Sequence, residues 1–459
     1  MSVRDPAWDP AADAPFGLPR IAWGRGSYVY DATGKRYLDA SGGPAVFCLG
    51  HAHPEVNEAI ERQLRRVAHG YRYTFTSDAL EELQALIAAA CGAELGTMVF
   101  VSGGSEAVES ALKIALQYHS ARGESSRRRF ISRRRSWHGN TLGALSVSDF
   151  LARRAPFEGA LIEASFLSSV NVYRPPPGVS AAELASVCAA ELETEIERLG
   201  ASQVAAFIFE PVVGAAGGVV PAPAGYAALI RDICDRHGVL MIADEVMCGS
   251  GRTGTWRALE HDGVVPDVMA VAKGLGGGYV PLGATLMHRR VAEVLTAVDG
   301  GPLTGHTFTG HTVACAAGVA VQTIIRRDRL LERVATGGAA LLQELRRCLA
   351  PIEAVGDVRG RGHFIGVELV ADRATRAPFP ASLGLAARIG RAAAAEGLLV
   401  YPIGGNVDGV SGDAIILAPP FNSSAAEFDE ICGLFTRAVR TAVASLPAGA
   451  ATGDAALRI

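Results

Sequence analysis

Two short apolar runs of the sequence each end in a side chain that could do chemistry. The run 239–243 is followed by the carboxylate of Asp244, and the run 268–272 is followed by the amine of Lys273 and then by glycines. Uninterrupted apolar runs of this length are typical of buried parallel strands. Because ligands bind beyond the carboxyl ends of such strands, we expect the acid and the amine to lie at one edge of a sheet.

An acid and an amine at one edge suit the cofactor pyridoxal phosphate. Lysine forms a Schiff base with the aldehyde of this cofactor. A carboxylate that pairs with the pyridine nitrogen keeps the ring protonated and electron-withdrawing. A salt bridge at a strand end would explain the same two residues, so the interpretation also requires a place for the phosphate.

The stretch 97–120 supplies such a place. A short apolar strand, 97–101, turns through Ser102-Gly-Gly-Ser105 into an amphipathic helix over 106–120. The start of a helix offers free N–H groups and the positive end of its dipole, which favour an anion. Gly104 allows close approach, and Ser105 adds a hydroxyl. The turn matches neither the GxxxxGK[ST] nor the GxGxxG pattern, which disfavours nucleotides.

Two further stretches contain side chains suited to a flat, polar ligand. Trp137 and His138 lie in the stretch 131–140, at the expected end of a strand, and the aromatic ring could stack on a cofactor or fill the core beside a turn. Glu210 follows another apolar run, 204–209. If that run is a strand of the same sheet, Glu210 reaches the edge that Asp244 reaches.

Composition excludes several classes of protein. The 459 residues are 49% apolar and 20% charged with a net charge of −4, as in soluble globular proteins without a nucleic-acid partner. We expect the arginine clusters 127–129 and 133–135 to be a solvated loop and strand start. No apolar run is long enough to cross a membrane, and the eight cysteines lack CxxC spacing, so we expect a cytoplasmic protein with reduced thiols. His51 and His53 lack a third ligand, so no metal site is predicted.

The elements around these residues predict an α/β fold. Apolar runs and helical patterns alternate over 97–287, which predicts a mostly parallel sheet with helices on both faces. A hairpin is expected over 27–39 and a long helical region over 312–350. We predict an N-terminal segment, 1–60, that contributes to a small domain. A large cofactor-binding domain, 61–310, and a small C-terminal α+β domain, 311–459, follow it.

Taken together, these stretches resemble the class III (subgroup II) aminotransferases, which are fold-type-I pyridoxal-phosphate enzymes with a large seven-stranded sheet. The relatives of omega-amine:pyruvate and diaminopelargonate type are the most similar. The resemblance covers about residues 25–440 and rests on six motifs in the order of the family: Ser102–Glu109, Trp137–Thr141, Glu210–Gly214, Asp244–Val246 with Gly251–Gly254, Lys273–Gly274 and Thr307–His311.

The resemblance implies a role for each matching residue. Lys273 would form the Schiff base and then act as general acid–base. Asp244 would hold the pyridinium proton, with His138 behind it. Trp137 and Val246 would cover the two faces of the ring.

The phosphate and substrate contacts are also implied by the resemblance. Gly104 and Ser105 would bind the phosphate, and Thr307 would reach it from the neighbouring subunit of a homodimer with shared sites. Trp23 and Glu210 would contact the substrate.

The sequence departs from the family pattern where many relatives bind a substrate carboxylate. Those relatives carry an arginine at the place of Ile416 or near Gly409, whereas the stretch 401–435 contains no arginine. Glu210 then lacks its usual partner and must find other donors or water, since an unpaired buried carboxylate is costly. Arg20, Arg72 or Arg252 could bind the carboxylate instead.

The resemblance therefore predicts an aminotransferase. We expect transfer of an amino group from a primary amine or ω-amino compound to a keto acid, with pyruvate preferred, by a ping-pong route. An aminomutase or an amino-acid racemase on the same scaffold is the alternative. A nicotinamide-dependent dehydrogenase is a more distant one.

Overall fold

The apolar runs of residues 97–287 form one seven-stranded sheet in the computed structural model, which describes residues 18–447. β12 runs antiparallel to β4 and β11, and the remaining neighbours are parallel, so the predicted mostly parallel sheet is confirmed. In spatial order, the strands are β4 (Thr97–Val101), β12 (Gly283–Met287), β11 (Val268–Val271), β10 (Leu240–Asp244), β7 (Val204–Phe209), β5 (Arg129–Arg133) and β6 (Ala164–Leu167).

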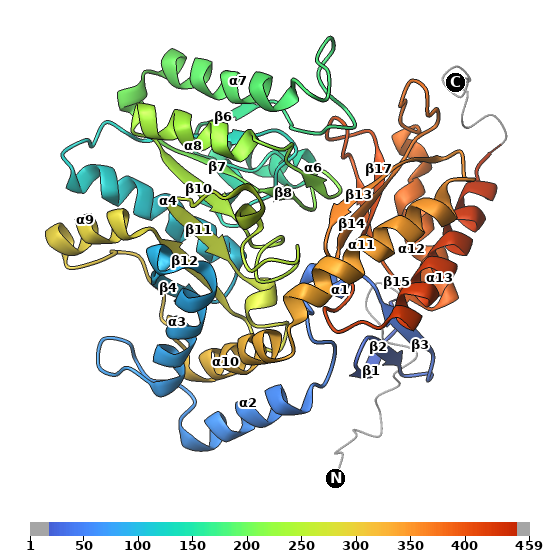
Figure 1. Cartoon of the computed structure of the whole chain (residues 1–459), viewed down its shortest axis with the longest axis horizontal. Coiled ribbons are helices and arrows are strands. Elements are labelled where there is room, and N and C mark those ends of the chain that lie inside the picture. The colour runs from blue at the N-terminus through green and yellow to red at the C-terminus, as the bar shows by residue number, and fades with distance from the viewer. Residues whose placement is uncertain (1–17, 448–459) are drawn as a thin grey trace.

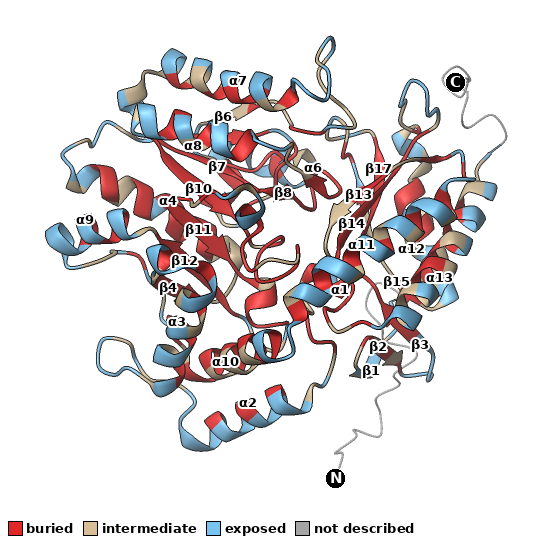
Figure 2. Cartoon of the chain, viewed as in Figure 1, coloured by how far each residue is buried: buried red, intermediate tan, exposed pale blue. Residues whose placement is uncertain are grey.

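Helices cover both faces of this sheet (Figure 1). The core on one face is shared with α3 (Asp78–Cys91), α7 (Leu184–Leu199), α8 (Tyr226–His237) and α10 (Thr312–Arg327). The core on the other face is shared with α4 (Gly104–Ala121), α5 (Leu142–Ser146) and α9 (Arg289–Asp299). The strands are therefore buried on both sides (Figure 2), which explains why their sequences are apolar without alternation.

A second lobe is built from the C-terminal part of the chain and a piece of the N-terminal part. Its main sheet is antiparallel, in the order β13 (Val355–Arg361), β14 (Phe364–Leu369), β17 (Asp413–Leu417), β16 (Tyr401–Gly404). Three helices pack with it, namely α11 (Leu330–Leu349), α12 (Leu385–Glu396) and α13 (Ala425–Ala444).

The N-terminal strands belong to this second lobe. β1 (Ile21–Arg25), β2 (Tyr28–Asp31) and β3 (Arg36–Asp39) form an antiparallel sheet, and β3 pairs in parallel with β15 (Leu398–Leu399). The hairpin predicted over 27–39 is confirmed as β2 and β3. Figure 1 shows these strands beside α13, far from the seven-stranded sheet.

The long helical region predicted over 312–350 is confirmed, and it consists of two helices, α10 and α11. The chain breaks between α10 and α11, where Arg329 has a left-handed φ of 53° that ends the regular helix. α10 packs against α3 and α2 (Pro54–Arg66) rather than against the C-terminal sheet. The predicted domain limits at 60/61 and 310/311 stay predictions. The outer limits, 1 and 459, lie outside the described residues.

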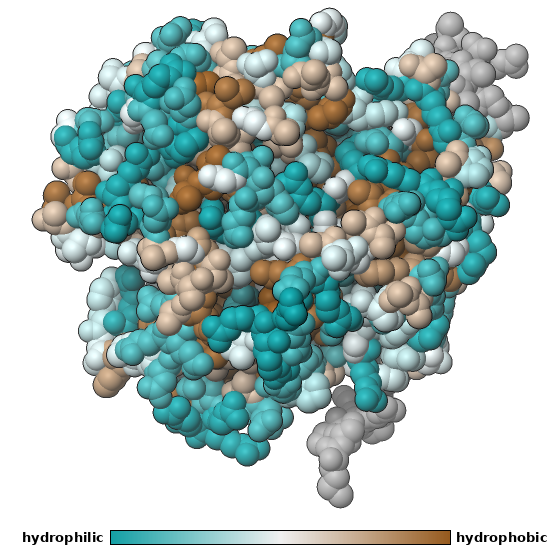
Figure 3. All heavy atoms as spheres, viewed as in Figure 1, coloured by the Kyte–Doolittle hydropathy of each residue, from teal (hydrophilic) through white to brown (hydrophobic). Residues whose placement is uncertain are grey.

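Short elements complete the chain. They are α1 (Gly42–Ala45), α6 (Leu151–Arg154), β8 (Val212–Val213) and β9 (Val220–Pro221), with 3₁₀ turns between the longer elements. α2 buries few of its side chains, and Figure 3 shows the hydrophilic surface that it gives the lower edge of the molecule. None of the described helices is long and apolar enough to cross a membrane.

Candidate active site

Asp244 ends β10 as a buried carboxylate with fixed partners. Its Oδ2 lies 2.7 Å from Nδ1 of His138, and its Oδ1 accepts the backbone N–H of Val246 at 3.0 Å. The other ring nitrogen of His138 lies 3.3 Å from the Ser132 hydroxyl, and the backbone N–H of His138 donates to Oγ of Ser148. With the carboxylate ionised, Nδ1 must carry the proton. The histidine thus holds an anion at the end of the strand, where sequence analysis placed it.

Glu210 lies beside this pair and has found donors in the backbone. The N–H groups of Trp137 and Gly214 donate to its two carboxylate oxygens at 3.0 and 2.8 Å. The prediction that Glu210 finds other hydrogen-bond donors in the absence of the arginine is confirmed. Burial raises the pKa of Glu210 to about 7, with the charge of Asp244 adding to the rise and His138 opposing it.

The arginines of 133–135 correct one prediction. Arg133 and Arg135 are buried rather than solvated. Arg133 donates to the backbone carbonyl of Glu210 at 2.5 Å, and Arg135 forms an ion pair with Asp149. Sequence reasoning missed both roles, because the partners are distant in sequence and a run of arginines resembles a solvated segment.

Lys273 lies at the same sheet edge as Asp244, as predicted. Asp244 pairs with Ala270 across β10 and β11, and Lys273 follows the end of β11 with a left-handed φ of 45°. Its Nζ lies 3.4 Å from the Pro44 carbonyl oxygen. Burial lowers the pKa of Lys273 to about 8, against the opposing pull of the Asp244 and Glu210 carboxylates. A neutral amine is therefore accessible near physiological pH, as a nucleophile requires.

The start of α4 forms a cradle that only small residues permit. Gly103 caps the helix without a side chain, so the N–H groups of the first turn have no partner within the helix. A Cβ on Gly104 would lie 2.6 Å from a γ-carbon of Val246, and one on Gly139 would lie 2.5 Å from the Ser105 hydroxyl. The turn, the Asp244 loop and the Trp137 loop therefore meet at the start of α4, whose N–H groups favour an anion.

Two of the predicted site residues are not brought to this place by contacts within one chain. Thr307 is exposed, and the described hydrogen bonds connect it to neither Gly104 nor Ser105. Trp23 is 53% exposed on β1 and stacks on Tyr30 with ring centroids 3.8 Å apart. Their roles in the site stay predictions.

The geometry fits pyridoxal phosphate. Three features lie together at the carboxyl edge of a parallel sheet, and this cofactor needs all three. They are a buried, hydrogen-bonded anion, an amine of lowered pKa and a helix start where only small residues fit. Fold and site together define a fold-type-I pyridoxal-phosphate enzyme. The family model for class-III aminotransferases matches residues 15–439, and the chain belongs to that family. The enzyme is a pyridoxal-phosphate-dependent aminotransferase.

Curated relatives agree with this assignment. The uncharacterized aminotransferase YodT of Bacillus subtilis (strain 168) is 38% identical over 421 residues, which are 92% of this chain and 95% of YodT. The adenosylmethionine-8-amino-7-oxononanoate aminotransferase of Geobacter sulfurreducens is 35% identical, with 92% of each chain covered.

A solved structure is also similar. An amine transaminase from an uncultivated Pseudomonas species, in its PLP-bound form, has a TM-score of 0.87 at 36% identity and covers 97% of this chain and 98% of its own. The fold, the cofactor and the reaction type expected from the sequence are thus confirmed.

Proposed function

We propose that this aminotransferase takes an amino group from a primary amine or ω-amino compound and passes it to pyruvate. The match to the aminotransferase family excludes the nicotinamide-dependent dehydrogenase. Similar structures include a thermostable (S)-enantioselective omega-transaminase from Thermomicrobium roseum, with a TM-score of 0.86, 36% identity and 96% and 97% of the two chains covered. The observation that carries the proposal is the placement of Lys273 and Asp244 at the ends of neighbouring strands.

Each residue of the site has one task in this proposal. When bound, pyridoxal phosphate supplies an aldehyde that reacts with amines and a protonated ring that withdraws electrons from the substrate. Lys273 would hold that aldehyde, and its freed amine would carry a proton to and from the substrate carbon. Asp244 keeps the ring nitrogen protonated, and His138 fixes the orientation of the carboxylate. Trp137 and Val246 would cover the two faces of the ring.

The phosphate contacts complete the site. Gly104 and Ser105 offer backbone N–H groups and a hydroxyl at the start of α4. Glu210 and Trp23 face the substrate in this proposal. The raised pKa of Glu210 means that its carboxyl group can be neutral below pH of about 7, when it repels a substrate carboxylate least.

A homodimer with shared sites is part of the proposal. Tyr73 and Phe308 are 73% and 56% exposed, and Gly305 lies against Arg72, so the segments 71–75 and 301–310 are side by side. A hollow next to them is lined by Ser102 at the start of α4 and by Phe308. Exposed aromatic side chains of this kind favour a second copy, whose Thr307 would complete the phosphate site. We also propose a cytoplasmic location, since the eight cysteines are free thiols and seven are buried.

Single-turnover spectra test the donor and the acceptor. The protein is loaded with pyridoxal phosphate, and its visible absorbance band is followed as one amine at a time is added. The proposal expects ω-amino acids or simple amines to bleach the band and pyruvate to restore it. A band that shifts with every amine but never bleaches would favour the aminomutase or racemase alternative. Sedimentation at micromolar concentration tests the dimer, and a monomeric active enzyme would contradict it.

A further inference from the structure

Arg153 is a cation that the reaction described above does not use. It lies on α6, directly after Phe150, and its side chain is exposed. Its guanidinium carbon lies 5.0 Å from the centre of the Trp137 ring and 5.4 Å from that of Phe150. These two rings meet edge to face at 5.7 Å. Arg153 therefore lies over the ring of Trp137, the residue that precedes His138 and whose backbone N–H donates to Glu210.

A third aromatic side chain faces Arg153 from the C-terminal lobe. Burial raises the pKa of Tyr401, and the charge of Arg153 opposes that rise, so the two groups are close. Trp137, Phe150 and Tyr401 all pack against one apolar cluster, which includes Ala45. Ala45 follows Pro44, whose carbonyl lies against the amine of Lys273. The aromatic side chains around Arg153 thus share one apolar cluster with the residue that follows Pro44.

The other arginines near this cluster are already engaged. Arg133 donates to the Glu210 carbonyl and Arg135 to the Asp149 carboxylate. Arg252, which sequence analysis offered as a carboxylate ligand, is buried and donates to the backbone carbonyls of Phe47, His363 and Pro419. Arg359 is paired with Glu368.

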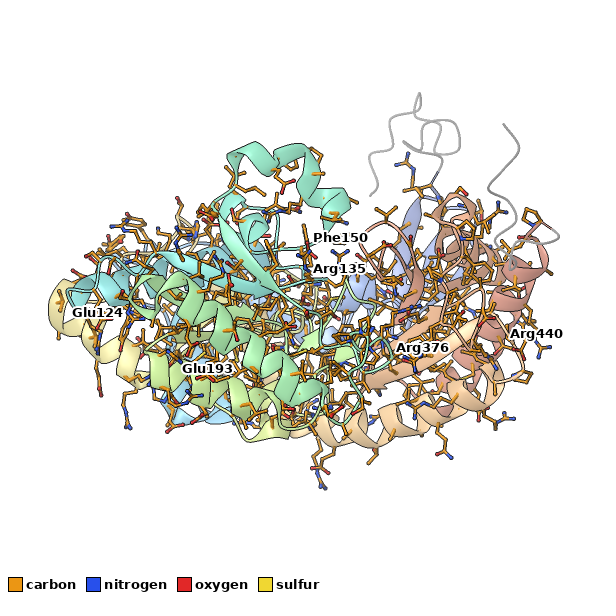
Figure 4. All side chains as sticks on the ribbon, turned by 90° about the horizontal axis from the view of Figure 1, so that it is seen from above. Glu124, Arg135, Phe150, Glu193, Arg376 and Arg440 are labelled. Carbon is orange, nitrogen blue, oxygen red and sulfur yellow. The ribbon has the colours of Figure 1, made fainter. Side chains whose placement is uncertain are left out.

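Arg153 differs from all of these. Within residues 18–447, its guanidinium contacts aromatic faces but has neither a carboxylate nor a carbonyl hydrogen bonded to it. Figure 4 shows the neighbouring Phe150 and Arg135 where the two lobes meet. The part of the C-terminal lobe that contains Tyr401, residues 401–435, has no arginine or lysine and so supplies no alternative cation.

We propose that Arg153 binds the carboxylate of the keto acid and of carboxylate-bearing amino donors, and so sets which substrates the enzyme accepts. The inference rests on the aminotransferase function proposed above. A guanidinium held on aromatic rings keeps its fork of N–H donors free for a carboxylate. The same rings can receive an uncharged aliphatic or aromatic group, so amines without a carboxylate would still bind beside it.

The test compares donors that differ in one charge. Arg153→Gln is measured with 4-aminobutyrate and pyruvate, and with butylamine as the carboxylate-free donor. Arg440→Gln, an exposed arginine at the outer end of the C-terminal lobe in Figure 4, is the matched control. For Arg153→Gln we expect KM for 4-aminobutyrate and pyruvate to rise on the order of 10- to 100-fold, because each carboxylate loses a charge-assisted hydrogen bond. KM for butylamine should stay within about twofold, and Arg440→Gln should change none of these values.

A binding measurement separates recognition from turnover. Calorimetry with the unreactive carboxylate propionate should show weaker binding to Arg153→Gln than to the wild type. Equal losses with both donors, or no loss with either, would overturn the inference. Failure of wild-type protein to react with any donor would instead overturn the proposed function, so the two failures are distinguishable.

Discussion

At the scale of single residues, the reactivity of the site depends on the amine of Lys273. Burial lowers its pKa from 10.5 to about 8, so a tenth of the amine is neutral about one pH unit below that value. The carboxylates of Asp244 and Glu210 limit the shift by favouring the charged amine. Desolvation thus makes the neutral, reactive amine accessible, and the nearby carboxylates keep its protonated form accessible as well.

The lowered pKa predicts how cofactor binding depends on pH. Only the neutral amine attacks an aldehyde, so the rate of pyridoxal phosphate binding to the apoprotein should rise from pH 6 to about 8 and level off above it. Stopped-flow absorbance measures this rate. The reaction of the cofactor with Nα-acetyl-lysine is the control, because that amine keeps the ordinary pKa and its rate rises further. A protein rate that keeps rising to pH 10 would contradict the lowered pKa.

At the scale of elements, the site exists because three loops approach more closely than side chains allow. Gly104 begins α4 where the γ-carbons of Val246 leave no space for a Cβ. A Cβ on Gly103 would meet nothing within 4 Å, and the backbone there is extended. Two neighbouring glycines of one turn therefore have different packing requirements.

This difference predicts different responses to alanine. Gly104→Ala should displace Val246 and lower the stability of the apoprotein by about 1–3 kcal/mol through overpacking. It should also weaken cofactor affinity, because we propose that Val246 covers one face of the cofactor ring. Gly103→Ala should leave apoprotein stability nearly unchanged. Denaturation midpoints and cofactor titration measure both effects. Equal losses of stability in the two variants would show that the close approach to Val246 is not the cause.

Several elements could be predicted from the sequence because their signals are local. The strands ending at Asp244 and Lys273 are uninterrupted apolar runs, and the turn before α4 has its own small residues. The break at Arg329 has no such signal, because neither glycine nor proline marks it. The burial of Arg133 and Arg135 depends on partners that only the fold brings near. The proposed roles of Thr307 and Trp23 have no support from contacts within the described chain, where Thr307 is exposed and Trp23 stacks on Tyr30.

At the scale of the whole molecule, a buried ion network joins the two lobes. Glu368 on β14 is fully buried and pairs with Arg359 on β13 and with Arg174 from the large domain. Arg359 also donates to the backbone carbonyls of Gly217, Gly218 and Val219. The network fixes the C-terminal lobe against the loop that follows Glu210.

Removing the central carboxylate should therefore be costly. Glu368→Ala leaves Arg174 without its anion and Arg359 with Asp357 alone, and we expect a loss of about 3–5 kcal/mol of stability. Glu353→Ala is the control, because Glu353 is 89% exposed and lies 3.9 Å from Arg373, a pair that should contribute less than about 1 kcal/mol. Chemical denaturation of both variants measures the difference. Similar midpoints would mean that the network does not hold the lobes together.

The account depends most on Lys273 as the residue that binds the cofactor. The sequence contains three lysines, Lys35, Lys113 and Lys273, and the first two are exposed. Reduction of the cofactor-loaded protein with borohydride, followed by peptide mass spectrometry, identifies the lysine that carries the cofactor. We expect the pyridoxyl mass on the peptide that contains Lys273, and no labelled peptide and no visible band with Lys273→Ala. Label on Lys35 or Lys113, with Lys273 unmodified, would contradict the account.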